Sequence, residues 1–189
     1  GVLIDDIRFT SAKPQQILSA EVVPFTLPAL VGNDTCPLLK LHVETAGQLD
    51  PIRVSEIKGT LAGTPDVSEL QELRLFLGGN DGNFATTKAI SPTESLSPRR
   101  SGNRGEFHLS CAAPKASATS ATDDALKEGT NYIWVAGRLR ENANIDHRLG
   151  ATCDHIKFSN GDSYHFDSAP SLQRMGVAIR NGGDDGVHT

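Results

Sequence analysis

The 189-residue sequence is poor in basic charge, in aromatic rings and in long apolar runs. Its 18 Lys and Arg against 23 Asp and Glu give a formal net charge of −5, whereas nucleic-acid phosphates select basic surfaces. We therefore exclude nucleic acid as a partner. No apolar run approaches the ~20 residues that cross a bilayer, and the first residues lack the charged, apolar and small-residue order of a signal peptide. A membrane span is not expected from these residues.

Cysteine is also scarce. Cys36, Cys111 and Cys153 are an odd number at wide spacing, which fits neither a disulfide framework nor a zinc pattern. Either all three are small buried hydrophobic residues, or Cys111 pairs with Cys153. A disulfide of this kind would fit an exported protein.

No familiar catalytic or metal-binding motif is present. Four of the six histidines fall in the polar phase of predicted strands, namely His42, His108, His155 and His165. There is no HExxH, HxH or paired CxxC spacing to hold a metal, and no GxSxG elbow to mark a nucleophile. Adjacent aspartates at 123–124 and 184–185 lie in turn-like segments. We expect no metal site, no cofactor and no catalytic residue in this chain.

What the sequence does contain is alternation of apolar and polar residues. Residues 37–45 show this alternation, which is typical of a strand with one face on a core. The apolar face holds Leu39, Leu41 and Val43, and the polar face holds Lys40, His42 and Glu44. The same pattern recurs in residues 71–79, 106–111, 154–158 and 163–166.

Nine or ten such strands, separated by turns, predict an all-β fold. We expect a two-sheet antiparallel β-sandwich of jelly-roll or immunoglobulin-like type. One or two short helical turns are predicted, one within residues 64–70 and one following Thr122. Residues 78–87 are interpreted as a hairpin turn, and residues 91–106 and 112–124 as loops.

Two strands have further features. Val54 lies in one phase of residues 52–61, and Ile57 lies in the other, which predicts a bulge near Ser55. Residues 131–139 are apolar on both faces, as expected for a central strand. Trp134 on this strand is therefore predicted to be a core residue.

Sugar binding requires exposed aromatic faces, because a pyranose ring stacks its C–H edges on them. The sequence has one Trp, two Tyr and seven Phe. The candidates for exposed rings are Phe76, which opposes the apolar face of its strand, and Phe84, which lies in a turn. Arg99 and Arg100, in the polar loop 91–106, complete the candidate carbohydrate-binding residues.

Two stretches carry a resemblance to a known family. Residues 37–79 contain an apolar strand, a strand ending in Thr-Leu-x-Gly-Thr, the segment Asp-Val-Ser-Glu-Leu and then LRLFLGG. Residues 126–158 begin with Leu-x-x-Gly-x-Asn-Tyr-x-Trp. In this order they resemble the N-terminal domain that precedes the catalytic propeller of bacterial BNR-repeat exo-sialidases. The resemblance covers roughly residues 20 to 189.

The resemblance implies a non-catalytic accessory domain of a secreted exo-sialidase, a glycoside hydrolase. In that family the propeller supplies an arginine triad, a Tyr–Glu nucleophile and an Asp acid/base, and none of these positions is carried over to this chain. The implied partners are the propeller of the same polypeptide and sialylated glycans. A structural spacer without glycan affinity is the alternative. A secreted, periplasmic or cell-surface location follows from the resemblance alone.

Three regions are expected on this basis. Residues 1–16 are either the tail of an upstream module or the first strand of this sandwich. Residues 17–173 form the accessory β-sandwich. Residues 174–189 form a junction strand and a linker to a propeller domain, and the strand through Val177 and Ile179 is expected to belong to the propeller and not to the sandwich. Residues after about 181, including Val187, are predicted to be poorly anchored.

Overall fold

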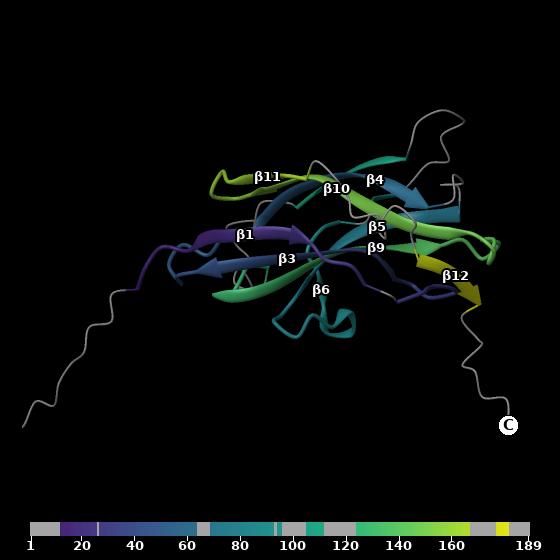
Figure 1. Cartoon of the computed structure of the whole chain (residues 1–189), viewed down its shortest axis with the longest axis horizontal. Coiled ribbons are helices and arrows are strands. Elements are labelled where there is room, and N and C mark those ends of the chain that lie inside the picture. The colour runs from purple at the N-terminus through teal and green to yellow at the C-terminus, as the bar shows by residue number, and fades with distance from the viewer. Residues whose placement is uncertain are drawn as a thin grey trace, which may run out of the picture.

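Two sheets, each of six strands among the described residues, face each other in the computed structural model (Figure 1). The structure describes residues 12–25, 27–63, 69–92, 94–95, 105–111, 124–166 and 177–181. The predicted all-β sandwich is confirmed. No described segment forms a helix that could span a membrane.

The first sheet has the strand order β1-β3-β9-β5-β6, with β7 also paired to β5. All of its pairings are antiparallel. Its strands are β1 (Gln16–Val22), β3 (Cys36–Ala46), β5 (Leu70–Gly78), β6 (Lys88–Ala89), β7 (Glu94–Ser95) and β9 (Gly129–Leu139).

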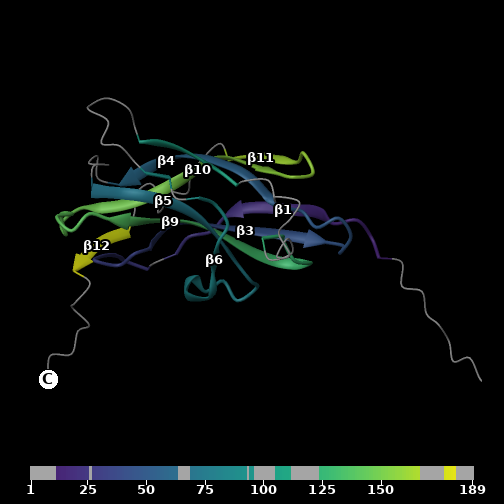
Figure 2. The same cartoon turned by 180° about the vertical axis from the view of Figure 1, so that it is seen from behind.

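The second sheet has the order β2-β12-β10-β4-β8, with β11 also paired to β10. Only the pairing of β12 with β2 is parallel among the described strands of this sheet. Its strands are β2 (Ala29–Val31), β4 (Val54–Gly63), β8 (Glu106–Ser110), β10 (Arg148–Phe158), β11 (Ser163–His165) and β12 (Val177–Asn181). Figure 2 shows β11, β10 and β4 in the layer that lies over β1, β3 and β9.

The core lies between the two sheets and is built from the apolar phase of each strand. Because successive side chains of a strand point to opposite faces, alternate residues enter the core. Fully buried members include Leu39, Leu41, Leu75, Ile133, Ile156 and Phe158. The outer faces carry the polar phase.

The predicted bulge at Ser55 is confirmed. In the pairing of β4 with β10, Glu56 is opposite Lys157 and Val54 is opposite Phe158, so Ser55 is left without a partner. This extra residue shifts the phase of the strand. As a result, Val54 and Ile57 both reach the core despite their odd spacing.

A close approach of three strands occurs at Gly59 in β4. Its neighbours are Cys153 of β10 and Phe107 of β8. A Cβ at this position would collide with the carbonyl oxygen of Thr152 and with the Phe107 ring. Glycine is therefore required here by space.

A short helical turn is present, but at a different place from the two that were predicted. The described residues contain a 3-10 turn at η2 (Phe84–Thr86), which lies inside the predicted hairpin turn between β5 and β6. In place of the helical turn after Thr122, Ala125 forms a β-bridge with Arg53. Of the other predicted turn, within residues 64–70, residues 64–68 lie outside the described residues, Glu69 is in a 3-10 conformation and Leu70 begins β5.

The strand expected to leave the sandwich is instead part of it. β12 lies between β2 and β10, and Ile179 is 1% exposed in the main core. Among the described residues, this strand therefore belongs to the sandwich. Residues 182–189, with Val187, lie outside the described residues, as do residues 1–11.

Candidate functional site

The outer face of the first sheet carries a strip of polar and aromatic side chains. The register of β3 with β9 sets Lys40 opposite Trp134, His42 opposite Tyr132 and Glu44 opposite Thr130. Directly opposed residues share one face of a sheet. The polar phase of β3 is thus brought against the aromatic phase of β9.

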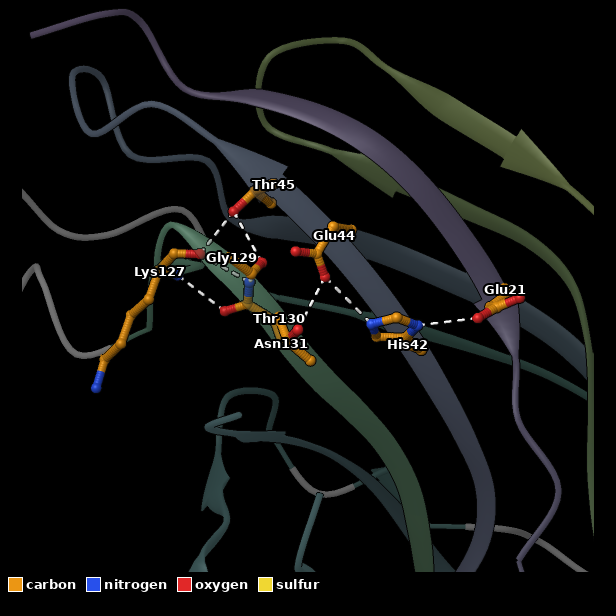
Figure 3. Close-up of polar contacts among 8 residues, drawn as sticks. All are labelled: Glu21, His42, Glu44, Thr45, Lys127, Gly129, Thr130 and Asn131. Carbon is orange, nitrogen blue, oxygen red and sulfur yellow. Dashed lines mark hydrogen bonds and ion pairs between the residues drawn. The ribbon is translucent and has the colours of Figure 1, made fainter. Parts of the chain in front are cut away.

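His42 is the centre of this strip (Figure 3). Its Nδ1 lies 2.9 Å from Oε1 of Glu21 on β1, and its Nε2 lies 3.3 Å from Oε2 of Glu44. Thr130 donates its hydroxyl to the same Glu44 oxygen at 2.9 Å. The imidazole stacks on the Tyr132 ring with centroids 5.3 Å apart. We call Glu21, His42, Glu44, Thr130 and Tyr132 the His42 strip.

Lys40 extends the strip toward the aromatic residues. Its Nζ lies 4.3 Å from the centre of the Tyr132 ring and 4.9 Å from that of Trp134. The ammonium group also donates to the carbonyl oxygen of Gly82 at 3.1 Å. Burial lowers the pKa of Lys40, and the nearby Asp81 carboxylate opposes that shift. The cation is therefore held over aromatic faces at a desolvation cost.

A small aromatic cluster lies next to Lys40. Its buried members are Phe76, Trp134 and Ala136, and Phe25 and Phe84 pack on them from outside. The Phe84 ring meets both Phe76 and Trp134 edge to face, with centroids 5.4 Å apart in each pair. The indole Nε1 of Trp134 is buried with no hydrogen-bond partner among the described residues.

The structure corrects the predicted exposure of the Phe76 ring. Phe76 points to the outer face, as its phase requires, but Phe84 covers it and leaves it only 9% exposed. Phe84 is half-buried in the same cluster. Arg99 and Arg100 lie outside the described residues. The structure therefore brings Phe76 and Phe84 together, but as packing partners.

The predicted pairing of Cys111 with Cys153 is not formed. All three cysteines are free, with Cys36 and Cys153 buried and Cys111 half-buried. The amide of Cys111 donates to Ser55 on one side of β4, whereas Cys153 is opposite Gly59 on the other side. Two strand spacings are about 10 Å, and a disulfide needs Cα atoms within about 7 Å.

Burial also makes these thiols unreactive. It raises the pKa of Cys111 to about 11 and that of Cys153 to about 12, with the charges of Asp124 and Asp154 adding to the respective shifts. The pKa of Cys36 is raised by burial too. Because the thiolate is the nucleophile, none of these residues is suited to covalent catalysis.

An open hollow of about 390 Å³ lies at one end of the sandwich. Its polar groups bond to one another. Gln15 accepts from the amide of Ile52 and donates to the carbonyl oxygen of Leu126, while Gln48 donates to Glu128 at 2.6 Å. The Gln15, Gln48 and Glu128 side chains of the hollow are therefore already hydrogen-bonded within the protein, as expected for a structural role.

The one buried carboxylate paired with a histidine in the described part of the chain also has a structural role. Glu69 lies 2.7 Å from Nδ1 of His147 and accepts from the amide of Asn144. These bonds fasten the connection between β9 and β10. Among the residues that the structure describes, no group of three or more His, Cys, Asp or Glu side chains could hold a metal ion.

Comparison with known proteins decides the family. Residues 17–162 match the family described as the N-terminal domain of BNR-repeat neuraminidase. The chain belongs to this family. A solved structure, "Hadza microbial sialidase Hz136", is similar with a TM-score of 0.54 and 16% identity. The alignment covers 85% of this chain and 30% of that one, so the chain spans about a third of that sialidase. No curated protein gives a significant match.

The motif Leu-x-x-Gly-x-Asn-Tyr-x-Trp in this neuraminidase N-terminal domain has a structural explanation (Figure 3). Asn131, which is 2% exposed, accepts from the amide of Lys127 at 2.8 Å and donates to the Lys127 carbonyl at 2.7 Å. Gly129 takes a φ of 91° within this turn, a value that glycine tolerates best. Thr45 fastens the turn to β3 by donating to Lys127 at 2.6 Å. The motif therefore builds the start of β9.

Sequence reasoning missed the His42 strip. The polar phase of Lys40, His42 and Glu44 was visible in the alternation of residues 37–45. Its aromatic partner Tyr132 lies about ninety positions away, and the register that joins them is a property of the folded sheet. The signal that could have found the strip is the combination of a polar strand face with an aromatic strand face.

Proposed function

We propose that this domain is the non-catalytic N-terminal accessory domain of a longer, secreted exo-sialidase, and that it packs on the catalytic propeller of the same polypeptide. The observation that carries the proposal is the family match over residues 17–162.

The test of the non-catalytic role compares the 189-residue chain with its longer parent polypeptide. We expect no turnover of a fluorogenic sialoside by the chain and turnover by the parent. Turnover by the chain alone would refute the non-catalytic role. A parent without sialidase activity would refute the sialidase assignment.

Packing on the propeller is tested by calorimetry. A domain that packs on a neighbour unfolds at a higher temperature when the neighbour is present, since the contact stabilises only the folded state. We expect the sandwich transition in the parent to lie above that of the 189-residue chain. Identical transitions in both proteins would favour the alternative, a spacer that makes no stabilising contact.

A second candidate function, glycan contact, is favoured by the exposed part of the His42 strip. Tyr132 is half-buried and presents its ring between His42 and Lys40, a combination of aromatic face and polar groups that suits sugars. Phe84, Arg99 and Arg100 remain proposed contacts.

Titration calorimetry with sialylated and asialo glycans tests this second function. Tyr132→Ala should abolish any heat of binding, and Tyr164→Ala, on the other sheet, is the matched control. Binding that is equal in both variants would exclude the His42 strip. An absence of heat with every glycan would leave the domain as a structural accessory.

A further inference from the structure

The outer face of the second sheet carries a continuous row of basic side chains. Four neighbouring strands, β8, β4, β10 and β11, each place one residue in the row. The register sets His108 opposite Lys58, Lys58 opposite His155, and His155 opposite His165. We call these four residues the histidine row. It lies on the opposite layer from the His42 strip.

Three side chains of the row are exposed, and His155 is half-buried, with 18% of its side chain exposed. Those of His108 and Lys58 are about half exposed, at 50% and 48%. The rings of His155 and His165 stack with their centroids 4.4 Å apart. Neighbouring strands lie about 4.8 Å apart, so the four side chains form a straight line of evenly spaced groups.

Glu56 is the carboxylate that holds the row together. One of its oxygens lies 3.0 Å from Nε2 of His108, and the other lies 3.4 Å from Nζ of Lys58 and 3.8 Å from Nδ1 of His155. The hydrogen bond from His108 is the main reason why the pKa of Glu56 is lowered. Glu56 therefore stays ionised in mildly acidic solution.

The positive charge of this face increases as the pH falls. Besides Glu56, the carboxylates facing outward are Glu106 on β8 and Asp154 on β10, which accepts from Thr60. Two lysines, Lys58 and Lys157, lie among these carboxylates. Arg148 on β10 and Arg180 on β12 are exposed farther along the same outer face. Each protonated histidine of the row adds one positive charge to this face.

Histidine is the side chain that ordinarily gains its charge in the mildly acidic range, with a pKa of about 6.5. The pKa of His155 is lowered, mainly by burial and then by His165, so His155 is protonated at a lower pH than an ordinary imidazole. The pKa of Glu56 is also lowered, and its carboxylate remains charged in this range.

We propose that the histidine row is a docking surface for an anionic, carboxylate-bearing polysaccharide, which it binds more tightly in mildly acidic than in neutral solution. The choice of a glycan over another polyanion rests on the proposed function as part of a glycoside hydrolase. Charge complementarity supports the choice of an anion. A row of cations one strand apart fits a chain that carries carboxylates at regular intervals.

The experiment measures retention of the 189-residue chain on immobilised polygalacturonate at pH 5.0 and pH 7.5 in low salt. Fully methyl-esterified polygalacturonate is the neutral ligand, and duplex DNA is the competing polyanion. We expect binding at pH 5.0 to be at least about fivefold tighter than at pH 7.5, since three surface charges each add a modest contribution. The methyl ester should not bind at either pH.

Variants assign the effect to the row. The triple variant His108→Gln, His155→Gln, His165→Gln should lose the pH dependence. Lys58→Gln should weaken binding at pH 5.0 but keep the preference for acid. Lys13→Gln, which removes one positive charge outside this sheet, is the matched control and should behave as the unaltered chain. Circular dichroism at both pH values checks that each variant is folded.

Three outcomes would overturn the proposal. They are no binding to polygalacturonate at pH 5.0, an unchanged pH dependence in the folded triple variant, and equal or tighter binding of DNA. The last would show a general polyanion surface. None of these results depends on sialidase activity of the parent polypeptide, so failure of this inference is separate from failure of the proposed function.

Discussion

Asn131 and Lys127 are joined through both main-chain polar groups of the lysine. The Asn131 amide oxygen accepts from the Lys127 N–H at 2.8 Å, and its nitrogen donates to the Lys127 carbonyl at 2.7 Å and to that of Gly129 at 3.0 Å. A single buried side chain thereby replaces the hydrogen bonds that a sheet partner would make. The turn that begins β9, the central strand, depends on it.

Asn131→Ala should destabilise the domain by about 2–3 kcal/mol, because it leaves buried main-chain groups without partners. Urea denaturation followed by circular dichroism measures the change. The control is Asn160→Ala, which removes an exposed asparagine bonded to Asp162 and should cost less than about 1 kcal/mol. Equal losses in the two variants would contradict the role given to Asn131.

Gly59→Ala should disrupt folding strongly. The added methyl group would collide with the Thr152 carbonyl and the Phe107 ring, and we expect a loss of more than about 3 kcal/mol. Gly79→Ala, where an added Cβ meets nothing within 4 Å, is the matched control. If thermal unfolding of the two variants is indistinguishable, the close approach of β8, β4 and β10 is wrong.

Phe84→Ala should uncover the aromatic cluster. Phe84 packs edge to face on Phe76 and Trp134, and its truncation should cost about 2 kcal/mol. Because Trp134 is the sole tryptophan of the sequence, its emission reports the cluster alone and should shift to longer wavelength. Ile145→Ala, at a side chain 48% exposed, should leave the emission unchanged.

The three thiols should be unreactive in the folded domain. With its pKa raised to about 11, Cys111 is a thiolate in only about one molecule in a thousand at pH 8. Reaction with a disulfide reagent at pH 8 should be slow in buffer and should reach three thiols per chain in urea. A single reactive thiol after unfolding would reveal a disulfide and would contradict the arrangement of Cys111 and Cys153 about β4.

The raised thiol pKa values also predict a pH dependence of stability. Folding raises the pKa of Cys111 from 9.0 to about 11 and that of Cys153 from 9.0 to about 12. The resulting stabilisation of the folded state is fully present below pH 9. As the pH rises from 9 through the raised values, the thiols ionise first in the unfolded state and this stabilisation is lost. The free energy of unfolding should therefore fall above pH 9. Cys153→Ala should reduce this dependence, and no reduction would assign it to other groups.

Local pattern predicted much of this fold. The phase change between Val54 and Ile57 located the bulge at Ser55, and the two apolar faces of residues 131–139 placed Trp134 inside. In both cases the information lies within a few neighbouring residues. Period-two alternation reports which side chains share a face, and the structure preserves those faces.

What covers a face could not be predicted in the same way. Phe76 was assigned to the correct face. Its exposure, however, depends on the turn after β5, which packs the Phe84 ring against the Phe76 ring. The position of β12 between β2 and β10 and the pairing of Ala125 with Arg53 are likewise contacts between distant segments. Such contacts depend on the tertiary arrangement of the whole chain, and the alternation of residues within one strand carries no information about it.

β12 also has a mechanical consequence. It is bonded along both edges, to β2 in parallel and to β10 in antiparallel orientation (Figure 1). A force applied along the strand beyond Asn181 would load these hydrogen bonds together in shear, and would have to extract Ile179 from the core at the same time. The domain would therefore resist tension at this point, because the hydrogen bonds of β12 would have to break together and not one after another.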